Sequence, residues 1–338
     1  MNRETSPAMT DVGRMLRPEL IIPLLRRFGP LLALLVMSSA LAVLSPHFLT
    51  FENALNVFRQ SAINALLALG QLLVIITAGI DLSVGSVLGL CCVLVALLLK
   101  AGVPALAAIA ATLAIGTALG MTNGLLFTKL RLPHPFIPTL GMMNVARGLA
   151  LVISGGFPIS ELPEDFRFWG AGALGGVPMP VIMVLVVYTM FHLFLTRTTI
   201  GRDIYAIGGN KQAARLAGIP VDRRLITVYA MSGGLAALGA ILLAGRMNSG
   251  FPLAGVGAEL DAIAAVIIGG ASFFGGVGTV WGTLVGALIM GVLRNGLNLL
   301  DVSAYWQTTV IGVVIVIAVW VDVLRQRALE HRGASRDL

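Results

Sequence analysis

Long apolar runs, separated by short polar or glycine-rich segments, dominate the chain from Phe28 almost to its C-terminus. Runs of about 20 residues are long enough to cross roughly 30 Å of hydrocarbon as helices. A β-barrel would instead show short segments in which apolar and polar residues alternate, whereas 311–321 is continuously apolar. The pattern predicts an all-α integral membrane protein with about ten transmembrane helices, at 28–45, 61–79, 83–99, 104–126, 136–153, 179–196, 225–245, 260–275, 279–298 and 305–323.

The composition agrees with this pattern and excludes a soluble enzyme. Hydrophobic residues make up 57% of the chain and charged residues 12%, and mean hydropathy is +0.93. The two cysteines, Cys91 and Cys92, are adjacent within an apolar run, where cysteine acts as a small hydrophobe. The four histidines are scattered, so we expect no metal site, no catalytic residues and no cofactor.

Positive charge predicts how the helices cross the membrane. The net charge of +7 does not indicate nucleic-acid binding, because the Lys and Arg residues gather in segments between helices, as in cytoplasmic loops of membrane proteins. This bias places both termini in the cytoplasm and the acidic segment 154–178 outside. The domains expected are a cytoplasmic leader at 1–27, a transmembrane permease domain at 28–323 with a cytoplasmic loop at 197–224, and a cytoplasmic tail at 324–338.

A faint internal repeat adds to this organisation. Ala68-Leu69-Gly70 followed by Ala78-Gly79 is echoed by Ala237-Leu238-Gly239 followed by Ala244-Gly245. Repeats offset by five helices have opposite orientations, as in the inverted-repeat plan of many transporters. In a chain with 40 glycines, chance similarity remains the alternative.

Glycines four residues apart recur in the apolar runs, as in Gly116, Gly120 and Gly124. Small residues at this spacing let helix backbones approach closely in lipid. We therefore expect tight helix packing at these glycines; that the packed seams slide during transport is the alternative hypothesis.

A carboxylate and hydroxyls interrupt the apolar pattern between the second and third predicted helices. Asp81 and Ser83 lie in the segment Gly79–Ser86, and an acid there needs water, a cation or backbone donors. Three roles are open for Asp81: a cap of the next helix, a partner between helices, and direct contact with a solute.

A second acidic position, Glu259 and Asp261, precedes the apolar run 262–270 and lies at the outer mouth in the predicted topology. Paired carboxylates perform acid–base chemistry, but neither a metal ligand set nor a nucleophile accompanies these two. We interpret them as a helix cap or as partners of Arg246 or Arg294. Arg147 and Arg294 lie within apolar helices, where an arginine either extends to the interface or faces a partner or a water-filled path.

The polar segment Gly201–Ile219 predicts a structured cytoplasmic loop. Asn210 is placed to cap a short helix that runs through Ala217 and ends at Gly218. A small apolar surface beside basic residues is formed by Ala213, Ala214, Leu216 and Ala217. Such a helix suits docking into a groove of another protein; lying on lipid headgroups is the alternative.

The sequence resembles the permease subunits of the ribose-type sugar ABC importers, in the superfamily that also contains branched-chain amino-acid permeases. The resemblance runs from about Pro46 to Asp322. The motifs that carry it are Gly79–Ser86, Gly201–Ile219, Glu259–Gly270 and Gly291–Leu300, the last with Asn295 and Asn298.

The resemblance implies an inner-membrane homodimer that carries a small sugar, ribose or a related monosaccharide, with two copies of an ABC ATPase subunit and a periplasmic solute-binding protein. The chain has no Gly-x-x-x-x-Gly-Lys-Ser/Thr phosphate loop of its own, so the ATPase is a partner. An ion-coupled secondary transporter is the alternative. The residues expected to couple to the ATPase are Gly201, Tyr205, Gly208, Asn210, Ala213, Ala214 and Gly218. The residues expected in the translocation pathway or its gates are Asp81, Ser83, Arg147, Glu259, Asp261 and Asn295.

Overall fold

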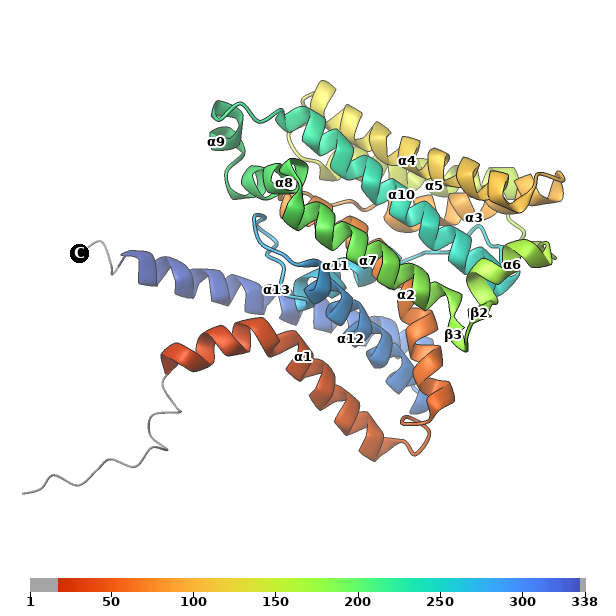
Figure 1. The fold of residues 1–338 in the computed structure, drawn as a ribbon, viewed down its shortest axis with the longest axis horizontal. Helices are drawn as coiled ribbons and strands as arrows, with labels where there is room; N and C mark the ends of the chain where they lie inside the picture. The colour runs from red at the N-terminus through yellow and green to blue at the C-terminus, as the bar shows by residue number, and fades with distance from the viewer. Residues whose placement is uncertain (1–17, 335–338) are drawn as a thin grey trace, which may run out of the picture.

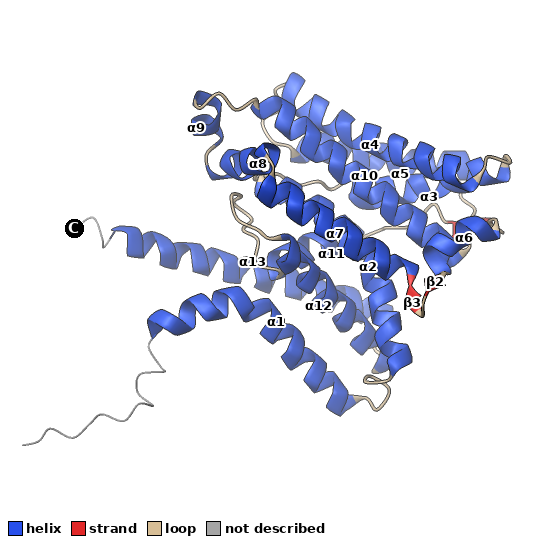
Figure 2. Ribbon diagram, viewed as in Figure 1, coloured by secondary structure: helices blue, strands red, loops and turns tan. Residues whose placement is uncertain are grey.

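The protein folds into a bundle of long helices with four two-residue strands, as the computed structural model shows (Figures 1 and 2). The structure describes residues 18–334, so the predicted leader falls largely outside the described residues. The helices are α1 (Pro18–Leu44), α2 (Phe51–Ile76), α3 (Val84–Lys100), α4 (Ala105–Lys129), α5 (Phe136–Ser154), α6 (Glu164–Ala171), α7 (Met179–Arg197), α8 (Thr199–Gly209), α9 (Lys211–Leu216), α10 (Val221–Met247), α11 (Ala258–Ile268), α12 (Val280–Leu299) and α13 (Ala304–Ala334). The strands are β1 (Ile159–Ser160), β2 (Ala173–Leu174), β3 (Val177–Pro178) and β4 (Ser249–Gly250).

The all-helical prediction is confirmed, and every predicted helix overlaps an observed one. Among the described residues, seven helices are long and apolar enough to cross a membrane, and Gly29–Leu44 and Val84–Lys100 are shorter apolar helices. The helix predicted at 61–79 begins ten residues earlier, because the Thr50 side chain accepts the Asn53 N–H and caps α2 at Phe51. The helix predicted at 260–275 ends at Ile268, just before Gly270 takes a left-handed φ of 93°.

The centre of the bundle is formed by α2, α3 and α10, whose side chains are largely buried. A helix that is apolar all round is expected at such a position. The surrounding helices α1, α4, α5, α7 and α13 expose large apolar side chains, among them Val43, Val152 and Trp320. Exposed apolar surface on this scale is what a lipid-facing perimeter requires.

The predicted tight packing at Gly116, Gly120 and Gly124 is confirmed, and the partner is α10. A Cβ at Gly120 would overlap the carbonyl oxygen of Tyr229 and lie 2.9 Å from the backbone nitrogen of Gly233. A Cβ at Gly233 would in turn overlap the carbonyl oxygen of Gly116. The two helix backbones therefore touch along a seam that admits no larger residue.

Replacing Gly120 by leucine should force α4 and α10 apart and lower the free energy of unfolding by about 1–3 kcal/mol, the usual cost of overpacking. The measurement is the thermal midpoint of the purified protein in detergent. Gly148→Leu is the matched control, because Gly148 lies on α5 with nothing within 4 Å of its would-be Cβ. Equal midpoints for the two variants would contradict the packing role of the seam.

The connecting segments gather at two opposite ends of the bundle. At one end, α8 and α9 lie on the same side as the first turns of α1 and the last described turns of α13 (Figure 1). At the other end lie α6 and the hairpin β2–β3, together with the pairing of β1 with β4, in which Ile159 faces Gly250. The sequence did not predict α6 as a helix within the segment 154–178.

Candidate functional site

The helix α8 packs against two links between the long helices. One link joins α2 to α3 and the other joins α11 to α12, and Gly208 touches both. A Cβ at Gly208 would overlap the carbonyl oxygen of Ile76, the last residue of α2, and would lie 2.5 Å from the backbone nitrogen of Gly276 in the second link. The Gly276 N–H donates to the same Ile76 oxygen at 2.8 Å. The Tyr205 hydroxyl donates to the Gly278 carbonyl at 2.8 Å, and burial raises the pKa of this hydroxyl, which stays a donor. Any movement of α8 therefore acts directly on both links.

The short helix α9 forms as the sequence predicts. The Asn210 side chain accepts the N–H groups of Gln212 and Ala213 at 3.0 and 2.9 Å, so the predicted cap is confirmed. Gly218 follows the helix with a φ of 82°, where glycine is favoured. Ala214 is buried, whereas Ala213 is exposed and Leu216 is 91% exposed. The large apolar side chain that α9 presents outward is that of Leu216, which belongs to the apolar surface expected from the sequence.

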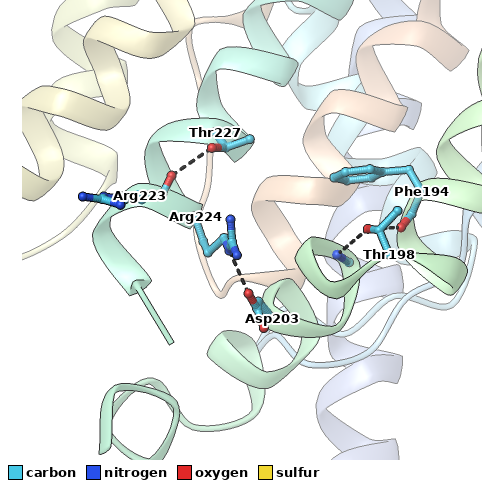
Figure 3. A network of polar contacts seen from close by, with 7 residues as sticks. Phe194, Thr198, Asp203, Arg223, Arg224 and Thr227 are labelled. Carbon is cyan, nitrogen blue, oxygen red and sulfur yellow. Dashed lines mark hydrogen bonds and ion pairs between the residues drawn. The ribbon is translucent and has the colours of Figure 1, made fainter. Parts of the chain in front are cut away.

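Polar contacts hold α8 to the helices on either side of it (Figure 3). Arg224 of α10 donates through Nε to Asp203 of α8 at 2.7 Å. Thr198 accepts the N–H of Gly201 at 3.0 Å and so caps α8, while its hydroxyl donates to the Phe194 carbonyl. Gly201 has no room for a side chain, because a Cβ would overlap the Leu195 backbone. These contacts therefore fix α8 to the end of α7 and to the start of α10.

A basic cleft of about 540 Å³ lies between α9 and the end of α4. The Lys211 ammonium lies 4.8 Å from the centre of the Phe127 ring, a cation–π contact. Partial burial and the neighbouring Arg215 lower the pKa of Lys211, against the opposite influence of Asp222. Arg131 adds a third positive charge to the cleft, so this surface suits an acidic partner.

Asp81 is 1% exposed and surrounded by donors. One carboxylate oxygen accepts the Ser83 N–H at 2.9 Å and the Ser83 hydroxyl at 2.6 Å. The other accepts the Ser232 hydroxyl of α10 at 2.9 Å. Asn123 of α4 donates to the Ser83 oxygen at 2.9 Å. Of the roles left open by the sequence, the partner between helices is confirmed by the bond to Ser232. The cap is not, because Ser83 is the N-cap residue of α3 and Asp81 accepts the N–H of Ser83 itself rather than one from the first turn of the helix.

Arg147 of α5 is bonded to backbone carbonyls rather than to a carboxylate. Its guanidinium donates to Pro252 at 2.6 Å, to Ala254 at 2.8 Å and to Gly85 at 3.4 Å. Glu259 lies beside the same place, since a Cβ at Gly85 would overlap its carboxylate. Arg147 thus ties α5 to the start of α3 and to the segment that precedes α11.

Asp261 and Arg294 form an ion pair, and one of the two partners proposed for Asp261 from the sequence is confirmed. The neighbouring Asn295 is instead paired with Asn53 of α2, and the two amides exchange hydrogen bonds of 3.0 and 2.7 Å. The residues predicted for the pathway therefore occupy separate places, which are the Asp81–Ser83 cluster, the carbonyl site of Arg147 with Glu259 nearby, the Asp261–Arg294 pair and the asparagine pair.

A cavity of about 250 Å³ opens beside the Asp261–Arg294 pair, between α2, α10, α11 and α12. Its polar lining residues are Gln60, Ser61, Asn64, Arg246, Asp261 and Arg294. Gln60, Ser61 and Asn64 are not among the residues predicted from the sequence for the pathway. The signal available for them was the presence of polar residues at the start of an otherwise apolar run.

Comparisons with known proteins extend over most of the chain. A family model described as "Branched-chain amino acid transport system / permease component" matches residues 53–319. The ribose import permease protein RbsC of Escherichia coli (strain K12) is 46% identical over 300 residues, 88% of this chain and 93% of that protein. RbsC of Bacillus subtilis (strain 168) matches with the same identity and coverage. The D-allose transport system permease protein AlsC of Escherichia coli (strain K12) is 41% identical over 298 residues, 88% and 91% of the two chains. No solved structure matches the chain.

Proposed function

The chain belongs to the family of branched-chain amino acid transport system permease components, and from this membership we propose that it is the membrane subunit of a bacterial ABC importer for a monosaccharide. The single observation that carries the proposal is the match to ribose import permeases over nearly the full length of both chains. Ribose is the first candidate solute. The similarity to a D-allose permease supports the monosaccharide class more broadly than ribose itself.

In this proposal the chain is a transport subunit and not an enzyme, and its energy comes from a partner ATPase. The elbow formed by α8 and α9 docks into the ATPase, with Leu216 and the basic cleft as its contact surface. Because Gly208 touches both Ile76 and Gly276, closure of the ATPases moves the α2–α3 link and the α11–α12 link at the same time. The first link connects the central helices α2 and α3, and the second connects α11 and α12, which carry the Asp261–Arg294 pair, so the movement reaches the residues proposed for the pathway.

The remaining features of the assembly belong to the same proposal. The α8–α9 end faces the cytoplasm, which places both termini inside and the segment from β1 to β3 outside, facing a periplasmic solute-binding protein. Shorter apolar helices, among them α3, join the seven long ones in the membrane. Two copies associate through apolar perimeter helices, and the two halves of the chain are related as an inverted repeat.

The test is uptake of radiolabelled D-ribose into proteoliposomes that contain the chain and its cognate ATPase, with the solute-binding protein added. We expect uptake to require ATP, the ATPase and the binding protein together, because the chain has no nucleotide site of its own. Vesicles with the permease alone and vesicles with a hydrolysis-deficient ATPase are the controls. Uptake driven by a proton or sodium gradient without the ATPase would instead select an ion-coupled carrier, the function that the intramembrane charges Asp81, Arg147 and Arg294 favour.

A further inference from the structure

The cavity beside the Asp261–Arg294 pair lies within a single copy of the chain, toward the end of the bundle opposite α8. It is lined by the middle of α2, the end of α10, the start of α11 with the segment before it, and the second half of α12, together with Leu88 of α3. The cavity of about 250 Å³ is many times larger than the space that one water molecule needs, so it can admit a small polar ligand.

Two buried polar atoms on the α2 wall of this cavity have no hydrogen-bond partner within the described part of the chain. They are the Ser61 hydroxyl oxygen and the amide oxygen of Asn64, and both residues line the cavity. Buried polar groups are nearly always hydrogen-bonded, and leaving one unpaired is costly. Ser61 is 3% exposed, so its hydroxyl is not satisfied by bulk solvent.

The opposite walls supply charged groups. Asp261 is 9% exposed and paired with Arg294. Arg246 donates one long hydrogen bond, to the Arg59 carbonyl at 3.4 Å, and no carboxylate of the described residues lies within 4 Å of it. A guanidinium carries five N–H donors, so most of the Arg246 donors remain available to a ligand. Leu67, Leu88 and Leu243 complete the lining with apolar surface.

We propose that this cavity is a binding station for a neutral monosaccharide on its way through the membrane. A sugar hydroxyl both donates and accepts, so one ring can donate to the Asn64 oxygen and accept from Arg246, while its C–H faces rest on the leucines. A polyol suits the site better than an anion, because the Asp261 carboxylate lies in the same wall. The inference rests on the proposed function and deepens it: each copy of the chain holds its own station.

The experiment uses the full assembly in proteoliposomes, with D-ribose as the probe. Asn64→Leu removes the amide at similar volume, and we expect ribose transported per ATP hydrolysed to fall about tenfold, while hydrolysis stimulated by the loaded binding protein stays unchanged. Asn144→Leu is the matched control, because Asn144 is exposed on α5 and bonds only the Leu140 carbonyl of its own helix. A defect in folding would lower hydrolysis and transport together.

A second variant, Asn64→Cys, tests occupancy directly. An impermeant methanethiosulfonate reagent should modify the introduced thiol, ribose should slow the modification, and the buried Cys91 and Cys92 should stay unreactive. If the wild type imports ribose but Asn64→Leu is normal and ribose does not protect the Asn64→Cys variant from the reagent, the station is refuted and the proposed function stands. If the assembled wild type imports neither D-ribose nor D-allose, the proposed function fails and the binding station fails with it.

Discussion

Replacing Gly208 by alanine is expected to lower ATP-driven uptake by about 5- to 150-fold, the range given by coupling energies of about 1–3 kcal/mol. The added methyl group would overlap the Ile76 carbonyl oxygen and crowd the Gly276 nitrogen. Both are backbone atoms of the links that α8 touches, so they cannot move aside as a flexible side chain does. The Gly276–Ile76 hydrogen bond of 2.8 Å would break, and α8 would no longer pack closely against the two links.

Gly209→Ala provides the matched control for this prediction. Gly209 is the next residue of the same helix, is exposed, and has nothing within 4 Å of its would-be Cβ. Both variants are reconstituted with the ATPase and binding protein, and sugar uptake is measured beside ATP hydrolysis. We expect Gly209→Ala to transport normally, and Gly208→Ala to hydrolyse ATP while its uptake shows the loss of about 5- to 150-fold. Normal transport by Gly208→Ala would contradict the transmission of force through this contact.

The fold was predictable from the sequence where the cause of each element is local. Apolar runs predict the long helices because the membrane requires them to be helical. The start of α2 was missed because Asn53, Arg59 and Gln60 resemble a polar loop. In the structure Asn53 is buried against Asn295, which is 242 positions away, and no local pattern indicates that partner. The helix α6 was missed because it has only eight residues, too few for a clear period.

The candidate site divides in the same way between local and distant causes. The Asn210 cap depends on residues two and three positions away, so the sequence predicts it. Asp261 requires a cation, and the sequence pattern does not distinguish between Arg246 and Arg294 as its partner. The cavity at Asn64 depends on four helices meeting, and only their packing reveals which polar residues of α2 face it.

Asp81→Ala is expected to lower the free energy of unfolding by roughly 3 kcal/mol, the scale for removing one member of a buried charged network. The change leaves the Ser83 N–H and the Ser83 and Ser232 hydroxyls without their acceptor in a place that water does not reach. Because these donors join the start of α3 to α10, the link that α8 contacts at Ile76 would loosen as well. A lower thermal midpoint should therefore accompany a loss of uptake.

Two further variants separate this buried cluster from a general effect of charge at Asp81. Asp222→Ala removes an aspartate from the exposed pair with Arg215, whose side chains are 64% and 51% exposed for arginine and aspartate, and such pairs contribute about 0–1 kcal/mol. Asp81→Asn keeps an acceptor oxygen at the same position, so it should recover part of the midpoint. The measurement is the thermal midpoint in detergent, with uptake beside it. A midpoint for Asp81→Ala no lower than that for Asp222→Ala would show that the link between α2 and α3 is held by its apolar packing alone.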